Sequence, residues 1–283
     1  MPTMLPPGLH RSSAWTWGTI SFVTNQSEVG QEIRANSVLP ARRESISLRT
    51  SDGLTLVGEL ASPAAGDPTA TIVCVHPLPI AGGMMDSHLF RKAAWRLPAL
   101  AGIAVLRFNT RGTESASGRS EGAFDNGEGE GLDLAAAVNF TVERGLPAPW
   151  LVGWSFGTDV IIKHPEVEPT VGAILLSPPL RYSSSQDMAA WAKTGKYVLA
   201  LVPELDDFLR PDQARREFAG YPQAEVKAVN ACKHLWVGEG YVRRALNEIV
   251  RTVTPVQGRA TDLGEYELPT SWDGPMEKWS DPL

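Results

Sequence analysis

The sequence has few cysteines and histidines, and it has no long apolar runs. Only Cys74 and Cys232 occur, too few for a disulfide framework in a chain of 283 residues. Neither they nor the five histidines have metal-ligand spacing, so we expect no metal site. No window approaches the roughly 18 apolar residues of a membrane span. The N-terminus also lacks a cleavage site, so we expect a cytoplasmic protein without a membrane partner.

The chain also lacks clustered positive charge. Its 26 basic and 32 acidic residues give a formal net charge of −6. The run "ARRES" at 41–45 is too short to form a basic stripe, and we interpret it as solvated surface. This balance argues against a nucleic-acid partner.

Three regions differ in composition. Residues 1–43 are rich in Pro, Ser and Thr and show no sustained period, so we expect a poorly ordered extension. Residues 44–255 have the length of one large domain with a well-buried core. Residues 256–283 contain prolines, acidic side chains and no periodicity, and we expect them to form an acidic tail.

Strand and helix patterns alternate through the central region. Residues 45–50 and 54–60 alternate polar and apolar positions, as in an antiparallel pair at a sheet edge. Continuous apolar runs predict strands buried on both faces at 69–77, 103–109, 149–154, 171–178 and 197–203, with a more exposed last strand at 224–230. Helical periodicity lies at 87–101, 128–144, 211–219 and 235–252. This order predicts the α/β class, with a mostly parallel sheet and helices on both faces.

One serine stands between two glycines where a buried strand passes into a helix. The stretch "LVGWSFGTDV" (151–160) carries Gly153, Ser155 and Gly157. A tight strand-to-helix turn forces such a serine into a strained conformation and leaves no room for side chains two residues to either side. We therefore expect Ser155 to be a nucleophile at the carboxyl end of the sheet. The alternative is an ordinary helix cap.

A serine nucleophile needs a base, and the base follows it in the chain in folds with such an elbow. His10, His76 and His88 precede Ser155, and His164 ends the short helix that begins after the serine. His234 remains, just past the last predicted strand in "NACKHLWVGEG". We expect it to be the base and to open a helix.

The acid that orients the base should follow the strand at 197–203. The chain there reads "ELDDFLRPD". We favour Asp206, keep Asp207 as the alternate acid, and rank Glu204 third because it is closer to the strand end.

Two backbone amides should stabilise a developing oxyanion. One should belong to Phe156, which follows the serine. The other should come from the loop "HPLPIAGGMMD" (76–86), where Leu78 is the donor between two prolines that have no N–H. His76 can hydrogen-bond across this loop, for which we expect a structural role.

Three polar residues follow another predicted strand, in "LRFNTRG" (106–112). Arg107 and Arg111 could bind a substrate carboxylate. We prefer the interpretation that they and Asn109 anchor the long loop at 110–127 to the sheet.

These motifs together resemble a known family. The segments "HPLPIAGGMMD" (76–86), "LRFNTRG" (106–112), "FDNGEGE" (124–130), "GWSFG" (153–157) and "KHLWVGE" (233–239) occur in this order in the small prokaryotic serine hydrolases of the α/β-hydrolase superfamily. The similarity runs from about residue 44 to 252. It implies an esterase-like or dienelactone-hydrolase-like enzyme that needs no cofactor, with Ser155, an Asp near 206 and His234 as its triad.

We therefore expect hydrolysis of a small-molecule carboxylic ester. A peptidase or a thioesterase would use the same triad, and a non-catalytic binding module would show a broken one. The interval 178–196 holds at most one short helix, so we expect no large cap domain but an open, shallow cleft. Met188, Trp191 and Trp236 could be its apolar walls or could equally be ordinary packing residues.

Overall fold

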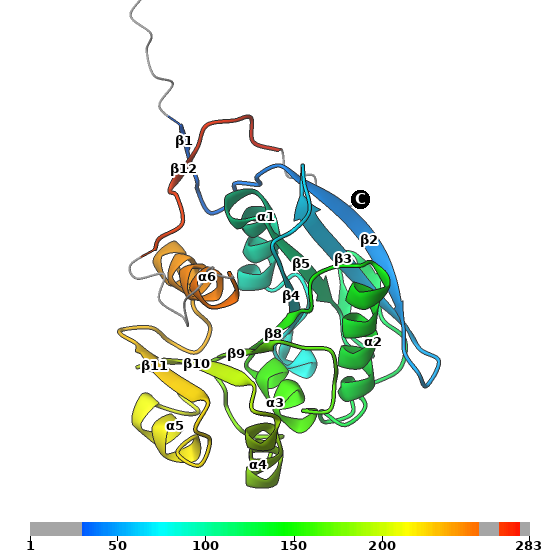
Figure 1. Ribbon diagram of the computed structural model, residues 1–283, viewed down its shortest axis with the longest axis vertical. Helices are drawn as coiled ribbons and strands as arrows, with labels where there is room; N and C mark the ends of the chain where they lie inside the picture. The colour runs from blue at the N-terminus through cyan, green and yellow to red at the C-terminus, as the bar shows by residue number, and fades with distance from the viewer. Residues whose placement is uncertain (1–29, 255–265, 278–283) are drawn as a thin grey trace, which may run out of the picture.

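One eight-stranded sheet forms the centre of the molecule (Figure 1). The computed structural model describes residues 30–254 and 266–277. The strand order is β11-β10-β9-β8-β4-β5-β3-β2. The strands are β2 (Ala41–Arg49), β3 (Thr55–Pro63), β4 (Ala70–Val75), β5 (Ile103–Phe108), β8 (Trp150–Trp154), β9 (Gly172–Leu176), β10 (Tyr197–Pro203) and β11 (Ala224–Val229). All neighbours from β11 to β5 are parallel, and β3 and β2 add an antiparallel edge. The predicted α/β class is confirmed.

Helices cover both faces of this sheet (Figure 1). Side chains of α1 (His88–Ala101) and α6 (Glu239–Val253) share one core layer with Ile72 and Cys74 of β4. The other layer contains Val73 and Val75 of β4 together with α2 (Glu130–Glu143), α3 (Phe156–Lys163), α4 (Ser185–Thr194) and α5 (Pro211–Glu217). Because successive strand residues point to opposite faces, the apolar run of β4 supplies both layers. Each such aliphatic side chain contributes about 1.5–3 kcal/mol when it is buried.

The two terminal regions pack on this domain more extensively than their composition predicted. β1 (Gln31–Glu32) pairs with β12 (Ser271–Trp272), and Leu39 and Leu268 are buried. The boundary expected at residue 44 falls inside β2, which begins at Ala41. Residues 30–43 and 266–277 are therefore ordered parts of the fold, whereas the rest of the predicted extension and tail lies outside the described residues. Short apolar segments that pack far from their sequence neighbours leave no periodic signal.

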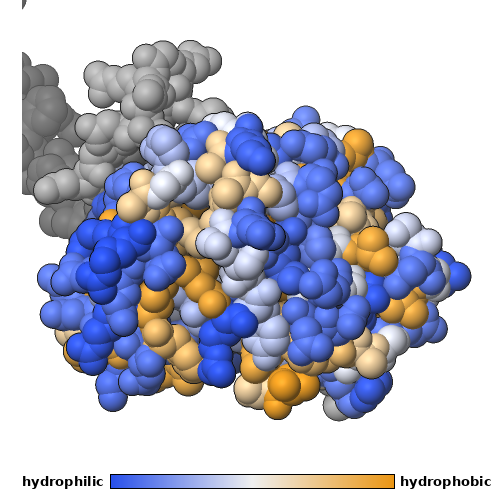
Figure 2. All heavy atoms as spheres, turned by 90° about the horizontal axis from the view of Figure 1, so that it is seen from below, coloured by the Kyte–Doolittle hydropathy of each residue, from blue (hydrophilic) through white to orange (hydrophobic). Residues whose placement is uncertain are grey.

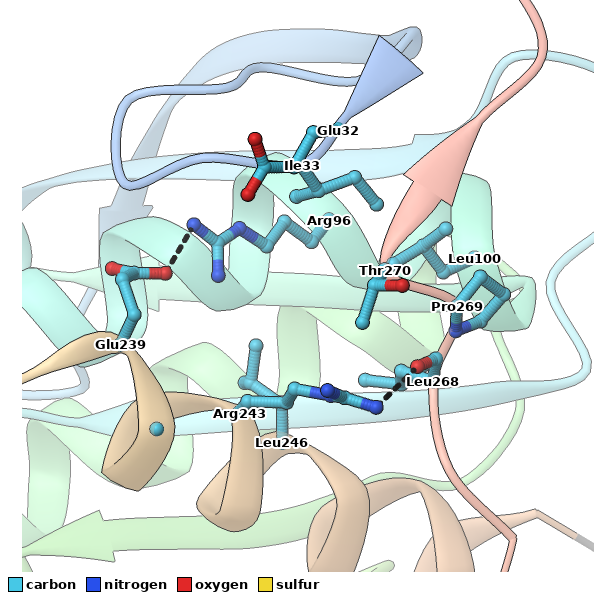
Figure 3. A pocket seen from close by; sticks show the side chains of 11 residues that line it. Glu32, Ile33, Arg96, Leu100, Glu239, Arg243, Leu246, Leu268, Pro269 and Thr270 are labelled. Atoms are coloured by element: carbon cyan, nitrogen blue, oxygen red, sulfur yellow. Dashed lines mark hydrogen bonds and ion pairs between the residues drawn. The ribbon is translucent and has the colours of Figure 1, made fainter. Parts of the chain in front are cut away.

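A hollow of about 240 Å³ lies where these terminal segments meet α1 and α6 (Figure 3). Arg96 of α1 donates to Glu239 of α6 across 2.9 Å, and Arg243 donates to the carbonyl of Leu268. The second contact attaches the C-terminal segment to α6, and Arg96 also donates to the carbonyl of Arg34 in the N-terminal segment. We call these two segments, residues 30–43 and 266–277, the terminal strap, which lies over α1 and α6 on the face opposite α3.

The start of α6 and the end of α3 differ from simple continuation of the helical pattern, and they determine which residues lie on loops at the carboxyl edge of the sheet. α6 begins at Glu239 rather than at 235, because Trp236 and Gly238 adopt positive φ values of 53° and 115°. His234 therefore lies on a loop and does not open the helix. α3 ends at Lys163, two residues before Pro165. No helix in the described ranges is long and apolar enough to span a membrane.

Short elements complete the described structure. A 3₁₀ turn, η1 (Pro79–Ala81), follows β4, and β6 (Glu114–Ser115) pairs with β7 (Gly118–Arg119) in the long loop after β5. Between β9 and β10 the chain forms only α4 and turns, so the described residues contain no large cap domain. The face seen from below Figure 1 is largely hydrophilic, with separate hydrophobic patches (Figure 2).

Candidate active site

Ser155 occupies the sharp turn between β8 and α3. Its φ and ψ are 53° and −122°, a conformation that is rare and strained for a residue with a side chain. A Cβ added at Gly153 would lie 2.6 Å from the carbonyl oxygen of Gly157, and one at Gly157 would lie 2.0 Å from that of Val75. Both positions therefore require glycine, and the turn brings the end of β4 against the elbow.

A continuous chain of hydrogen bonds starts at the Ser155 hydroxyl. Its Oγ lies 2.8 Å from Nε2 of His234, and Nδ1 of the same ring lies 2.9 Å from Oδ2 of Asp206. A carboxylate accepts hydrogen bonds, so Nδ1 carries the ring proton. In the neutral ring Nε2 is then the acceptor, and the serine hydroxyl donates to it. The arrangement holds the tautomer that a base acting on Ser155 needs.

Asp206 alone of the three candidate acids contacts His234. Its side chain is buried, and its Oδ1 accepts hydrogen bonds from the amides of Phe208 and Leu209. Asp207 is exposed. Glu204 is also exposed, and its Oε2 accepts from the Ala231 amide. Two backbone donors on one oxygen orient the other oxygen of Asp206 toward the imidazole.

The loop that carries His234 is anchored from inside the protein. The carbonyl of His234 accepts hydrogen bonds from Nε1 of Trp154 at 3.2 Å and from the hydroxyl of Ser177 at 3.0 Å. Nε1 of Trp236 donates to the same Ser177 hydroxyl at 2.8 Å. Ser177 was not singled out from the sequence. Its only signal is its place at the end of a buried strand, where polar groups reach the carboxyl edge.

The proposed oxyanion donors lie on the two segments that meet at the elbow. Phe156 is the first residue of α3, so its amide has no acceptor within the helix. Leu78 follows β4 by three residues, and a Cβ at Gly157 would lie 2.9 Å from the carbonyl oxygen of His76 in the same loop. Neither amide donates to another residue within the described parts of the chain. Both N–H groups therefore lack an acceptor among the described residues.

His76 is buried, and both of its ring nitrogens are hydrogen-bonded within the protein. Its Nδ1 lies 2.6 Å from the carbonyl oxygen of Pro77, and its Nε2 accepts from the amide of Thr110 at 3.0 Å and lies 3.1 Å from the hydroxyl of the same residue. Burial lowers the pKa of His76 to about 4. The ring therefore joins the loop after β4 to the loop after β5 as a neutral side chain.

Arg107 and Arg111 are each bound to two carboxylates. Arg107 pairs with Glu59 at 2.9 Å and with Asp86. Arg111 pairs in the same way with Asp133 and Asp52, at 2.8 and 3.0 Å. Asn109 accepts a hydrogen bond from the amide of Met85 and donates to Ser115, and both arginines are buried. Asn109 holds the loop at 110–127, as we preferred, whereas Arg107 holds the loop at 76–86 and Arg111 binds α2 through Asp133. Neither arginine is open to a substrate carboxylate.

The three candidate wall residues are packing residues. Met188, Trp191 and Trp236 are 9%, 2% and 0% exposed. Trp191 donates to the carbonyl of Ile161, and Met188 packs in the same core layer. They therefore line the core and not a cleft. No group of three or more His, Cys, Asp or Glu suited to a metal ion occurs in the described ranges.

Comparisons with known proteins agree with this geometry at the level of the fold. No protein-family model matches the sequence. The uncharacterized protein RP471 of Rickettsia prowazekii is 31% identical over 132 residues, which cover 44% of this chain and 52% of that protein. The match thus spans about half the length of this curated relative.

The alignments with solved structures cover almost the whole length of those structures. An α/β serine hydrolase homologue from Coxiella burnetii aligns with TM-score 0.62 and 24% identity, over 74% of this chain and 96% of that one. XC6422 of Xanthomonas campestris, an α/β serine hydrolase without a lid, aligns with TM-score 0.57 and 23% identity, over 76% of this chain and 93% of that one. The esterase Pf2001 of Pyrococcus furiosus aligns with TM-score 0.60 and 17% identity, over 76% of this chain and 94% of that one. The protein therefore has the α/β-hydrolase fold, and its described residues contain no large cap domain.

Proposed function

We propose that this protein is a serine hydrolase that cleaves carboxylic esters of small molecules. The observation that carries the proposal is the unbroken chain from the Ser155 hydroxyl through His234 to Asp206, with links of 2.8 and 2.9 Å. A non-catalytic binding module on this fold would have no reason to maintain such a chain together with a strained serine. Thioester or peptide hydrolysis would use the same groups and is the alternative.

The reaction begins with attack of the serine on the ester carbonyl. As Oγ of Ser155 forms the new bond to carbon, Nε2 of His234 takes its proton, and the Asp206 carboxylate stabilises the resulting imidazolium. The carbonyl electron pair moves to oxygen, where the amides of Leu78 and Phe156 donate to it. An amide of this kind lowers the barrier by about 3–4 kcal/mol.

The intermediate then collapses and the alcohol leaves. His234 returns its proton to the departing oxygen, which leaves an acyl ester on Ser155. Water attacks this ester, gives its proton to His234, and passes through a second oxyanion to release the acid and regenerate the serine. Every proton removed in one half of the cycle is returned in the other, so the sequence of steps needs no cofactor.

The test is hydrolysis of p-nitrophenyl butyrate together with labelling by a fluorophosphonate probe. We expect Ser155→Ala and His234→Ala to lower kcat by at least about 10⁴-fold, and Ser155→Ala to abolish labelling. Ser47→Ala changes an exposed serine on β2 and should leave both unchanged. Full turnover in folded Ser155→Ala protein would refute the proposal. Butyryl thioesters and peptide anilides, assayed in parallel, identify the bond cleaved.

A further inference from the structure

We propose that the loops around Ser155 bind an extended aliphatic group of the substrate, so that esters of longer acyl chains are preferred over acetates. Eight large hydrophobic side chains in the described residues are exposed. Five of them lie on the three loops that carry the proposed site, and we call these five the apolar rim: Ile80, Leu205, Phe208, Leu235 and Val237. This inference rests on the proposed ester hydrolysis.

The outward direction of the rim is imposed by the loop that carries the base. Side chains alternate along this loop, with His234 and Trp236 buried and with Leu235 and Val237 exposed by 54% and 72%. Trp236 has a positive φ, and its Nε1–H is bonded to the buried Ser177 hydroxyl. Because the inward residues are held in this way, the two aliphatic side chains between and beyond them are presented to solvent.

The loop that carries the acid adds an aromatic wall beside the reacting ring. Phe208 is 47% exposed, and its ring centroid lies 4.5 Å from that of His234. The guanidinium of Arg181 lies 5.6 Å from the same aromatic ring. The Leu205 amide donates to the carbonyl of Cys232, which ties the two loops together. The loop that carries the acid and the loop that carries the base are therefore held side by side.

Exposed apolar side chains are normally scattered, and their concentration at one place indicates binding. The remaining three, Leu132, Val142 and Val171, lie on α2 and just before β9. In the proposed complex the substrate chain lies along the rim, where Phe208 stands beside the His234 ring. Each methylene that moves from water onto such side chains raises kcat/KM by up to about fourfold.

The test compares p-nitrophenyl acetate, butyrate and octanoate. We expect kcat/KM of the wild-type protein to rise at least about tenfold from acetate to octanoate. Leu235→Ser combined with Val237→Ser should reduce this rise to less than about threefold and leave acetate hydrolysis within twofold. The matched control combines Val142→Ser with Val171→Ser, which removes two exposed apolar side chains elsewhere and should preserve the full rise.

Each other outcome overturns the inference in a distinguishable way. Ser155-dependent hydrolysis with equal kcat/KM for all three esters refutes the rim as a substrate site and leaves the proposed function intact. If none of the esters is hydrolysed, the proposed function fails and the inference fails with it. If the rim variant loses binding of phosphatidylcholine vesicles while chain length has no effect, the rim is a lipid-docking surface.

A second, independent observation concerns His76. The geometry points to His76 as a positioning residue for the Leu78 amide, one of the two proposed oxyanion donors. The carbonyl of Pro77 and the N–H of Leu78 belong to the same peptide group, which is planar. Since Nε2 of His76 accepts from Thr110, Nδ1 carries the proton and donates it to the Pro77 oxygen at 2.6 Å. Fixing that oxygen fixes the direction of the N–H.

Gly83 packs against the same peptide group. A Cβ at Gly83 would lie 2.1 Å from the Pro77 oxygen and 2.9 Å from the Leu78 nitrogen, and the Gly83 amide donates to the Leu78 carbonyl at 2.9 Å. The peptide is thus held by a hydrogen bond from a buried ring and by backbone contact. The bond to its oxygen also polarises the amide and makes its N–H a stronger donor.

Two variants of His76 separate positioning from general packing. In His76→Asn the amide NH₂ can replace Nδ1 as donor to Pro77, whereas in His76→Gln the amide reaches toward Thr110 instead. We expect His76→Gln to lower kcat about 10–100-fold with KM within threefold, and His76→Asn to keep kcat within threefold. If His76 had a purely structural role, both substitutions would lower the melting temperature and the two variants would not differ in kcat.

Equal kcat in both variants, or a change confined to KM, would overturn the role. If His76→Gln does not fold, the other variant decides alone, because a tenfold or larger fall of kcat in folded His76→Asn refutes the assignment. Wild-type protein that hydrolyses no ester would instead refute the proposed function.

Discussion

Two buried histidines lie on loops at the same edge of the sheet and differ in what faces Nε2. In His234 the Nδ1 proton points to a carboxylate and Nε2 faces a hydroxyl that can give up its proton. In His76 the Nδ1 proton points to a carbonyl, and Nε2 faces both the amide and the fully buried hydroxyl of Thr110. A carboxylate at Nδ1 and a half-buried serine at Nε2 suit His234 to the proposed role of a base. His76 has neither feature and instead joins two loops.

The largest expected effect comes from breaking the carboxylate partner of His234. Asp206→Asn allows the amide NH₂ to donate to Nδ1, which moves the ring proton to Nε2, where it blocks proton transfer from Ser155. We expect kcat for p-nitrophenyl butyrate to fall about 10⁴-fold. The control Asp207→Asn changes the exposed neighbour and should alter kcat less than twofold. A larger loss in Asp207→Asn than in Asp206→Asn would reverse the assignment of the acid.

A smaller effect is expected on the pH dependence of stability, to which the buried His76 contributes. The folded-state pKa of about 4 lies below the ordinary 6.5, so below pH 6.5 the unfolded chain binds a proton that the folded protein excludes. Stability is therefore lost as the pH falls from 6.5 toward 4. Between pH 7 and 4.5 we expect the free energy of unfolding of the wild type to decrease by about 2 kcal/mol more than that of His76→Asn.

The measurement is urea unfolding of both proteins at several pH values. Above pH 7 the difference in stability between them should stay constant, because His76 is neutral in both the folded and the unfolded state. Parallel curves down to pH 4.5 would show that His76 becomes protonated without cost in the folded protein.

The parallel strands were predictable because each is a local apolar run. Residues 103–109 and 149–154 were expected as strands, and β5 and β8 lie within them. The terminal strap was not predictable in this way. Leu39 and Leu268 lie in short segments without periodicity, and their contacts are with other elements, since the Leu39 amide donates to the Trp95 carbonyl of α1 and the Leu268 amide donates to the Asn247 side chain of α6. The start of α6 was also missed, because no pattern in the sequence shows that Trp236 takes a positive φ.

At the candidate site, elimination and motif order selected Ser155 and His234, and the structure brings them together. The choice between Asp206 and Asp207 was open in the sequence, since adjacent residues have the same chemistry and opposite directions. In the structure the Asp206 side chain points inward, two backbone amides donate to one of its oxygens, and only this carboxylate contacts the imidazole. Met188, Trp191 and Trp236 show the converse, because residue type alone does not separate a pocket wall from core packing.

Local patterns were enough to predict the layered α/β architecture and the position of the elbow, because buried strands need apolar runs and a sharp turn needs glycines at defined spacing. The folded chain was needed to show which carboxylate reaches the imidazole, which partners each histidine has and which hydrophobic side chains face solvent. These properties depend on directions and contacts between segments far apart in the chain, and a linear pattern carries no direction.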